Sequence, residues 1–144
     1  MIKLDHIGFV VDDIDRYAEL FRALGLAEAT DPVEHPSQKM TASFINIGQR
    51  DEVYLEILEP THEISPATNF LKKNGGGLHH LCFEVDDIVK ISKNLVEKGF
   101  KMINPIEDCE AYDKNLKREC KSVSRIAFFI LGDRLIVELI EKGV

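Results

Sequence analysis

The stretch HIGFVVDDI at residues 6–14 occurs a second time as HLCFEVDDI at residues 80–88. Six of the nine positions are identical, including the histidine and the closing Val-Asp-Asp-Ile. A second pair ends each half of the chain, because LEILE at residues 55–59 matches VELIE at residues 137–141. Matching segments in the same order indicate two copies of one supersecondary unit. The sequence therefore predicts a duplicated fold.

The first copy predicts a strand, a helix and three further strands. After the opening strand, Ile14, Tyr17 and Phe21 recur at helical spacing, and Asp12 or Asp13 supplies the N-cap. The expected segments are a strand at residues 4–11, a helix at 13–24 and strands near 26–30, 40–48 and 52–59. The order of elements is therefore βαβββ.

The second copy repeats this order after a linker. Its expected segments are a strand at 80–86, a helix at 87–98 and strands near 100–103, 123–131 and 134–141. Between the copies, Ser65 and Pro66 open a short helix that ends at the glycines of residues 75–77. Since neither copy can close a core alone, we expect a single domain. It would span 1–144, with module one at about 1–60, the linker at 61–78 and module two at about 79–144.

Composition and charge argue against several classes of protein. A chain of 144 residues with a net charge of −7 predicts one globular domain, and the acidic balance argues against nucleic acid as a partner. No apolar run approaches the roughly 18 residues of a membrane span. The charges close to the first apolar segment do not fit a signal peptide. Three cysteines without a CxxC motif indicate reduced thiols in the cytoplasm.

Strand parity separates residues that face a helix from residues that face away from it, because side chains alternate between the two faces of a strand. In the opening strand of each copy the apolar face packs on the helix, so His6 and His80 lie on the opposite face. The same alternation in the closing strands puts Glu56 and Glu138 on that face. His79 falls on the other face of its strand. Each copy therefore offers one histidine and one glutamate.

Two imidazoles and two carboxylates form a mixed nitrogen and oxygen donor set. A strand glutamate between apolar neighbours, such as Glu138, is costly to bury unless it is paired or binds a metal. A single strand histidine or glutamate is common without such a role, but matched pairs in two copies favour a shared site. We expect His6, Glu56, His80 and Glu138 to bind one divalent ion, which could be Co, Ni, Zn or Mn. Four ligands leave two octahedral positions for water or substrate.

The chain also resembles the vicinal oxygen chelate superfamily of glyoxalases, bleomycin resistance proteins and dioxygenases. Four blocks carry the resemblance in the expected order: HIGFVVDDI, LEILEP, SPATNFLKKNGGGLHHLCFEVDDI and IVELIE. Within the superfamily, the chain is most similar to methylmalonyl-CoA epimerases and glyoxalase-I-like proteins. The resemblance implies an α+β fold. In it, two βαβββ modules form a cupped, mostly antiparallel sheet with helices on the outer face.

The resemblance further implies a metal-dependent isomerase or lyase. The metal positions of the family fall on the four residues that parity selects. Enzymes of this kind transfer a proton next to a carbonyl through a metal-stabilised enolate. Glu138 is then expected to act as base as well as ligand, with Glu56 as its symmetry mate. The implied substrate is an acyl-CoA or a thiol adduct, and the implied assembly is a homodimer.

Two segments depart from the family pattern. Epimerases of this kind usually carry a glutamate just before the third strand of the first module, where this chain has Ser-Gln-Lys-Met at residues 37–40. In the second module, a charged stretch at residues 108–121 replaces the usual glycine-rich one. We expect residues 104–122 to form a long loop, which could be a lid over the metal or a solvated segment.

Substrate contacts and the reaction type have alternatives. Lys72 and Lys73 could contact a CoA phosphate and Arg125 a substrate carboxylate, although each also fits a surface role. A glyoxalase-I-like lactoylglutathione lyase would use the same site. A non-catalytic binding or resistance protein can dispense with metal ligands, so four candidate ligands argue against it. Dioxygen chemistry is a weaker alternative, since its iron sites use two histidines and one carboxylate.

Overall fold

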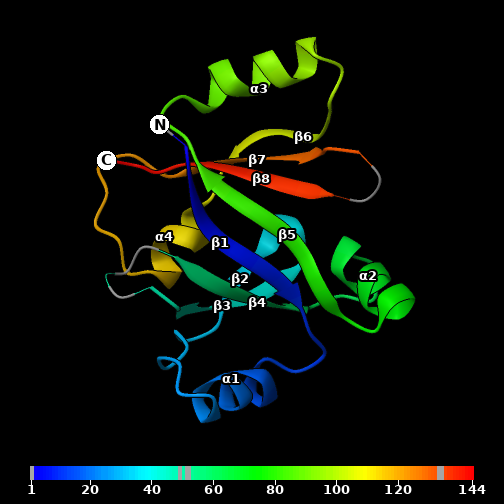
Figure 1. The fold of residues 1–144 in the computed structure, drawn as a ribbon, viewed down its shortest axis with the longest axis vertical. Helices are drawn as coiled ribbons and strands as arrows, with labels where there is room; N and C mark the ends of the chain where they lie inside the picture. The colour runs from blue at the N-terminus through cyan, green and yellow to red at the C-terminus, as the bar shows by residue number, and fades with distance from the viewer. Residues whose placement is uncertain (1, 49, 51–52, 133–134) are drawn as a thin grey trace.

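The computed structural model of the chain describes residues 2–48, 50, 53–132 and 135–144. Glu52 and Arg134, which the sequence places in strands, lie outside this part of the chain. One sheet contains eight strands in the order β2-β3-β4-β1-β5-β8-β7-β6 (Figure 1). The strands are β1 (Lys3–Val10), β2 (Val33–His35), β3 (Met40–Asn46), β4 (Tyr54–Pro60), β5 (Gly77–Glu84), β6 (Lys101–Asp108), β7 (Arg125–Ile130) and β8 (Ile136–Glu141).

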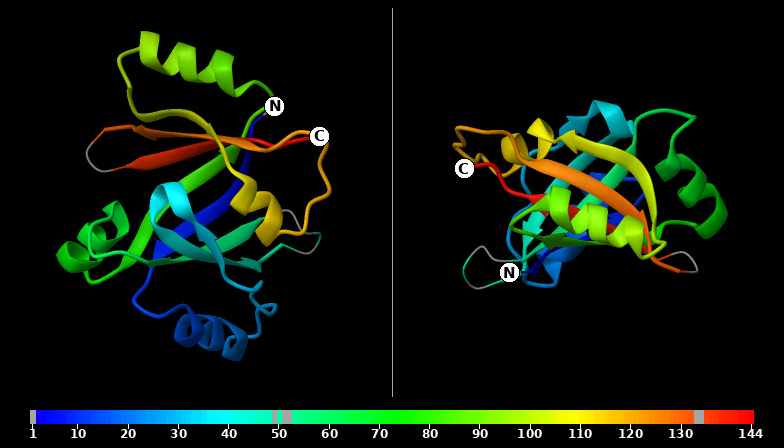
Figure 2. Two further views of the ribbon diagram at one scale, coloured as in Figure 1. Left: turned by 180° about the vertical axis from the view of Figure 1, so that it is seen from behind. Right: turned by 90° about the horizontal axis from the view of Figure 1, so that it is seen from above.

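Two related halves meet at the centre of the sheet. β1 and β5 pair in antiparallel fashion, and each also has a parallel neighbour, β4 for β1 and β8 for β5. The remaining pairs are antiparallel. The sheet curls, so the two halves face each other across a cup (Figures 1 and 2). The predicted α+β class and the mostly antiparallel, cupped sheet are confirmed.

Two helices cover the outer face of the sheet, one on each half (Figure 2). Helix α1 (Ile14–Ala23) packs on a cluster that contains Ile45 and Ile57, and helix α3 (Ile88–Glu97) packs on one that contains Phe129. These three side chains are almost fully buried. Burying a side chain of this size contributes about 1.5–3 kcal/mol. The outer position that the sequence predicts for these two helices is therefore confirmed.

Matched acidic residues hold the first turns of both outer helices. Asp13 and Asp87 are the N-caps, and each accepts a backbone N–H from the first turn of its helix. Glu59 accepts the N–H of the first residue of α1 at 3.3 Å, and Glu141 accepts that of α3 at 2.9 Å. These two glutamates therefore have a structural role away from the interior of the cup.

Two further helices pack on the inner cluster of the cup. Helix α2 (Pro66–Asn74) begins after the predicted N-cap Ser65 and contributes buried Ala67. Helix α4 (Glu110–Asn115) contributes Tyr112, which is 2% exposed. Figure 2 shows α4 lying over the concave side of the sheet. The inner face is therefore closed partly by a helix that the sequence does not predict.

The prediction of a long loop over residues 104–122 is wrong. β6 continues to Asp108, and α4 follows almost at once. The buried charge of α4 is paired, because Asp113 accepts a hydrogen bond from Arg118 at 2.7 Å and one from the backbone of Ser124 at 2.9 Å. Pairing allows a charge-rich segment to fold against the sheet. The solvated interpretation fails for α4, because its Tyr112, Asp113 and Asn115 are buried, and the lid over the metal stays a prediction.

The prediction of a strand near residues 26–30 is also wrong. Thr30 makes one backbone contact, from its N–H to the carbonyl of Phe44 at 2.9 Å, and Pro32 follows. The strand that does form is β2, and Pro36 ends it after three residues by opening a short 3₁₀ turn at Pro36–Gln38. Proline lacks the N–H that a strand ladder needs, so the two prolines limit β2 to an edge fragment.

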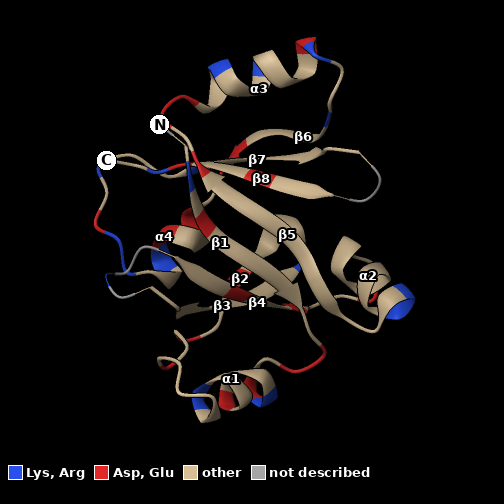
Figure 3. Cartoon of the chain, in the orientation of Figure 1, with Lys and Arg blue, Asp and Glu red and all other residues tan. Residues whose placement is uncertain are grey.

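Charged residues lie mainly on the helices and connections, whereas acidic residues also occur within β1 and β8 (Figure 3). In the described part of the chain, no helix is long and apolar enough to cross a membrane. Cys82, Cys109 and Cys120 are all free thiols. The acidic positions inside the strands are therefore the unusual feature of the charge distribution.

Candidate metal centre

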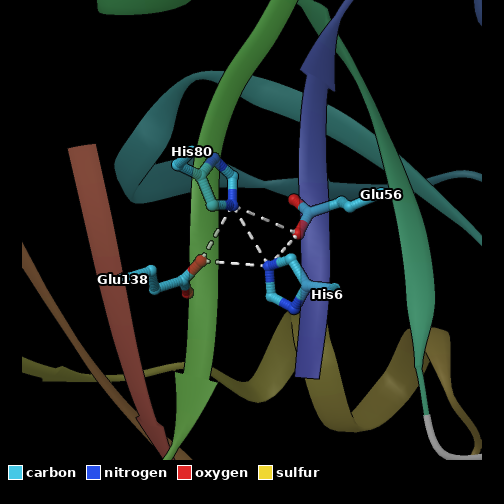
Figure 4. A group of neighbouring side chains, drawn as sticks. All are labelled: His6, Glu56, His80 and Glu138. Atoms are coloured by element: carbon cyan, nitrogen blue, oxygen red, sulfur yellow. Dashed lines mark hydrogen bonds and ion pairs between the residues drawn. The ribbon is translucent and has the colours of Figure 1, made fainter. Parts of the chain in front are cut away.

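Four side chains from four adjacent strands converge inside the cup (Figure 4). The Nε2 atom of His6 lies 2.7 Å from Oε2 of Glu56 and 3.1 Å from Oε2 of Glu138. The Nε2 atom of His80 lies 3.0 Å from the same oxygen of Glu138 and 3.1 Å from Nε2 of His6. All four residues are at most 5% exposed. The four residues selected by strand parity therefore come together.

Strand register explains why these residues meet. In the parallel pair β1–β4, Glu56 is level with Gly8, two residues beyond His6. In the parallel pair β5–β8, Glu138 is level with Cys82, two residues beyond His80. Because residues two apart share a strand face, each glutamate projects to the same side as its histidine. The antiparallel pairing of β1 with β5 then brings the two histidine–glutamate pairs together.

The donor atoms fit a divalent metal ion. They all lie within 4.8 Å of one another, and the separations given above run from 2.7 to 3.1 Å. Neighbouring ligands with metal bonds of about 2.1 Å stand about 3.0 Å apart at right angles. A buried set of two imidazoles and two carboxylates is also typical of Zn, Co, Ni or Mn sites. His6, Glu56, His80 and Glu138 could therefore hold such an ion.

Close carboxylates make the centre electrostatically demanding. Burial lowers the pKa of His6, but Cys82 and the carboxylates of Glu56 and Glu138 outweigh it and raise that pKa well above 6.5. Burial raises the pKa of Cys82 strongly, so its thiol is uncharged near neutral pH and the carboxylates carry the effect. Burial likewise opposes ionisation of both glutamates, yet His6 holds the pKa of each below its usual range. In metal-free protein, a proton on His6 therefore balances part of the negative charge.

Two β-bulges lie next to the two histidines. Between β1 and β5, the register steps from Leu4 to His6 against consecutive residues of β5, which leaves Asp5 as an extra residue. On β5 the register steps over His79 in the same manner. A bulge breaks the alternation of side chains. The expectation that His79 faces away from His80 therefore fails, because its Nδ1 atom lies 2.9 Å from Nδ1 of His80.

A cavity of about 570 Å³ opens beside His80. Its wall combines apolar and polar side chains, and the described lining includes no aspartate or glutamate. The lining residues are Ser37, Gln38, Lys39, Met40, Ile64, Ser65, Pro66, Asn69, His79, His80, Ile103, Asn104, Phe128 and Ile136. Phe128 lies opposite Glu138 across β7–β8, and Ile136 stands two residues before it. The cavity therefore borders the Glu138 side of the centre.

A known sequence family matches most of the chain. The model of the Glyoxalase/Bleomycin resistance protein/Dioxygenase superfamily matches residues 5–116. The chain belongs to this superfamily. The predicted resemblance to the vicinal oxygen chelate proteins is thereby confirmed.

Several similar proteins are named as epimerases. The mitochondrial methylmalonyl-CoA epimerase of Dictyostelium discoideum is 32% identical over 113 residues, which are 78% of this chain and 66% of that protein. The ethylmalonyl-CoA/methylmalonyl-CoA epimerase of Cereibacter sphaeroides is 34% identical over 102 residues, 70% of this chain and 74% of that protein. The chain thus spans slightly less than two thirds of the Dictyostelium protein.

A solved superfamily structure has the same fold. The methylmalonyl-CoA epimerase of Streptomyces coelicolor, in a variant bound to 2-nitronate-propionyl-CoA, superposes with a TM-score of 0.79. Its sequence is 28% identical, and the match covers 97% of this chain and 94% of that one. The superfamily fold therefore extends over nearly the whole chain.

The three residues that the sequence predicts to contact substrate do not line the cavity beside His80. Arg125 forms an ion pair with Glu141 at 2.5 Å, and Lys72 and Lys73 are exposed in the last turn of α2. None of the three lines the cavity, so their contact with substrate stays a prediction. Sequence reasoning missed Lys39, which does line it. The feature that could have identified Lys39 is its position in residues 37–40, the segment where related epimerases carry a glutamate.

Proposed function

We propose that this protein is a metal-dependent epimerase acting on the carbon next to the thioester of an acyl-CoA such as methylmalonyl-CoA. The observation that carries the proposal is the buried cluster of His6, Glu56, His80 and Glu138 at the edge of a cavity of about 570 Å³. The names of the relatives support the reaction. A cavity of this volume falls in the usual range for small-molecule sites.

Glu138 is the proposed base. When bound, a divalent ion would stabilise negative charge that develops on a substrate oxygen. Phe128, the register partner of Glu138, and Ile136, two residues before it, line the cavity, so Glu138 lies next to the cavity wall. Glu56 instead lies opposite Phe44, which is 1% exposed. The open side of the centre therefore favours Glu138 for proton removal.

Epimerisation also requires proton delivery to the opposite face of the carbon. Residues 37–40 supply no carboxylate at the position where related epimerases usually have one. Glu56 is the remaining carboxylate of the centre and lies across His6 from Glu138. We therefore assign the second proton transfer to Glu56, with Glu138 and Glu56 acting from opposite sides.

The cavity indicates where an anionic part of the substrate lies. Lys39 is the only lysine or arginine in the described lining. Its backbone is left-handed, with φ 54° and ψ 45°, and is held by hydrogen bonds to Pro36 at 3.2 Å and from Thr61 at 3.0 Å. A non-glycine residue in this conformation usually marks a local requirement. We assign Lys39 to the substrate carboxylate or a CoA phosphate.

The experiment is proton exchange with metal-loaded protein. The purified protein should contain about one divalent ion per chain by mass spectrometry of the metal. In deuterium oxide, proton NMR should show solvent deuterium entering the position next to the thioester of methylmalonyl-CoA. Turnover of a hemithioacetal without such exchange would establish a glyoxalase-I-like lyase instead. Absence of bound metal, with no thermal shift on adding Co, Ni, Mn or Zn, would indicate a non-catalytic binding protein.

A homodimer in the cytoplasm remains part of the proposal. Both modules supply ligands within one chain, so the metal centre itself needs no second copy. The homodimer rests on family resemblance, and the cytoplasmic location rests on the free thiols and the acidic charge. Light scattering after size-exclusion chromatography should give twice the mass of the chain.

A further inference from the structure

Asp5 is a fully buried carboxylate beside the candidate metal centre. It is 0% exposed, as is His6. Its Oδ2 atom accepts a hydrogen bond from Nδ1 of His6 at 2.7 Å. Its Oδ1 atom accepts one from the hydroxyl of Tyr112 at 2.9 Å and pairs with Nζ of Lys142 at 2.9 Å. A buried carboxylate with three donors is fully satisfied.

The bulge on β1 is what lets Asp5 reach this position. In a regular strand, neighbouring residues point to opposite faces, so only one of Asp5 and His6 could face the interior. The register shift between Leu4 and His6 places both inside the cup. The local irregularity of β1 therefore builds a contact between two consecutive side chains.

The two nitrogens of His6 have separate partners. Nε2 faces Glu56 and Glu138, whereas Nδ1 faces Asp5. A carboxylate that accepts the Nδ1 proton fixes the ring orientation and leaves the Nε2 lone pair for a cation. We propose that Asp5 is a positioning residue that sets His6 as a metal ligand and that Tyr112 of α4 holds Asp5 in place. This inference rests on the metal site of the proposed function.

Tyr112 gives α4 a part in the centre. Its ring packs at right angles to Phe44, with centroids 5.7 Å apart, and its hydroxyl bridges both oxygens of Asp5, at 2.9 and 3.1 Å. Burial and Asp5 raise the pKa of Tyr112, so it stays a hydrogen-bond donor throughout the physiological range. Helix α4, which forms where the sequence predicts a loop, therefore supports the metal ligand His6 through Tyr112 and Asp5.

In the described part of the chain, no carboxylate is hydrogen-bonded to Nδ1 of the second ligand histidine, His80. Nδ1 of His80 faces Nδ1 of His79, the extra residue of the bulge on β5. Asp5 and His79 each precede a ligand histidine, yet only Asp5 brings negative charge. The duplicated centre is therefore asymmetric, and His6 is its anchored ligand.

The test is cobalt binding by purified, metal-free, full-length protein. Competition with a chelator gives the affinity, and visible absorption of bound Co(II) reports the ligand geometry. Asp5→Asn should weaken Co(II) binding by roughly 10–100-fold, as is common for such partners. Tyr112→Phe keeps the buried ring, and it should weaken binding by about 3–10-fold. Both variants should alter the absorption bands.

Matched controls separate positioning from stability. Glu84→Gln removes another partner of Lys142, whose Nζ lies 3.0 Å from Glu84, but does not touch His6. Tyr17→Phe removes a hydroxyl from the cluster beneath α1 that contains Ile45 and Ile57. Both controls should keep the wild-type cobalt spectrum. Their Co(II) affinity should stay within about twofold of the wild-type value, because neither change touches His6.

Two results would overturn the inference. Folded Tyr112→Phe protein with wild-type cobalt affinity and spectrum would refute the bracing role, even if Asp5→Asn fails to fold. Folded Asp5→Asn protein with the wild-type spectrum would refute the positioning role. Wild-type protein that binds no cobalt would instead remove the metal site and the proposed function with it.

Discussion

Gly8 on β1 lies directly opposite His80 on β5, and a Cβ atom at position 8 would come within 2.1 Å of Cε1 of the His80 ring. Contacts this short do not occur, so any side chain at position 8 must displace the imidazole. The equivalent position in the other half is Cys82, which lies opposite His6 and is fully buried. The duplicated strands therefore tolerate a small side chain next to one ligand histidine and none next to the other.

Gly8→Ala should accordingly impair the metal centre. Displacement of His80 removes one ligand from its geometry, and we expect at least about tenfold weaker Co(II) binding, the size seen when ligand orientation is lost. Competition with a chelator measures the affinity. Cys82→Ala is the control, because it shortens the facing residue on the other side, and it should bind Co(II) within about threefold of wild type. Unchanged affinity in Gly8→Ala would show that the ring can move without cost.

Metal binding should release protons near neutral pH. His6 in the metal-free protein has a pKa well above 6.5, so a proton occupies the site that a metal needs. Calorimetric titration with Co(II) at pH 7, in buffers of different ionisation enthalpy, should detect this release. An enthalpy that does not depend on the buffer would contradict the protonated state of His6.

The thermal stability of the metal-free protein should depend on pH, and His6 and the two glutamates should contribute in opposite directions. The raised pKa of His6 gives metal-free protein a stabilisation that is complete below about pH 6.5, the unfolded value, and is lost as pH rises through the folded pKa. The lowered pKa values of Glu56 and Glu138 give one that is present above about pH 4.5 and lost as pH falls. The increase in Tm on adding Co(II) should therefore be larger at pH 8 than at pH 6. Equal increases would contradict this expectation.

The candidate ligands could be predicted because strand parity and duplication act on the same residues. A period of two fixes which face His6 and Glu56 share, and the repeat provides the second pair. The sequence does not contain the signal for the bulges, since an extra residue in a ladder depends on the partner strand. Strand parity therefore assigns Asp5 and His79 to the face opposite the ligand histidines, whereas the bulges place them beside those histidines.

Helix α4 could not be predicted because its stability is tertiary. It has six residues, too few for a stable isolated helix, and its sequence is rich in charge. Asn115 donates to the backbone carbonyls of Asp31 and Ala42, both at 3.1 Å, so distant segments hold the helix. The local sequence of α4 does not indicate these partners, because they lie far away along the chain.

Lys39→Met should weaken substrate recognition without disturbing the metal centre. The change removes the only lysine or arginine of the described cavity lining and keeps a side chain of similar length. We expect KM for methylmalonyl-CoA to rise about tenfold, as for the loss of one charge-assisted contact, with Co(II) affinity unchanged. Lys72→Met and Lys73→Met on α2 are matched controls and should leave KM unchanged. A raised KM in either variant would instead support the phosphate contact that the sequence predicts.

Substrate truncation identifies the group that Lys39 contacts. Methylmalonyl-pantetheine retains the carboxylate and lacks the nucleotide phosphates. If Lys39→Met raises KM equally for both thioesters, Lys39 binds the carboxylate. If the effect is confined to the CoA ester, Lys39 binds a phosphate. An unchanged KM for both would refute the assignment.

Glu138→Gln and Glu56→Gln should separate the two proton transfers. Glu138→Gln removes the base next to the cavity, so deuterium entry into the epimer that it deprotonates should fall by about 10²–10⁴-fold. Glu56→Gln should lose inversion, but it should still exchange the proton of that epimer with solvent. Proton NMR of each methylmalonyl-CoA epimer in deuterium oxide distinguishes these outcomes. His80→Ala provides the comparison for metal loss, because it removes a ligand that carries no base. Cobalt affinity reduced as far in Glu138→Gln as in His80→Ala would attribute the lost exchange to the metal and leave the base role without support.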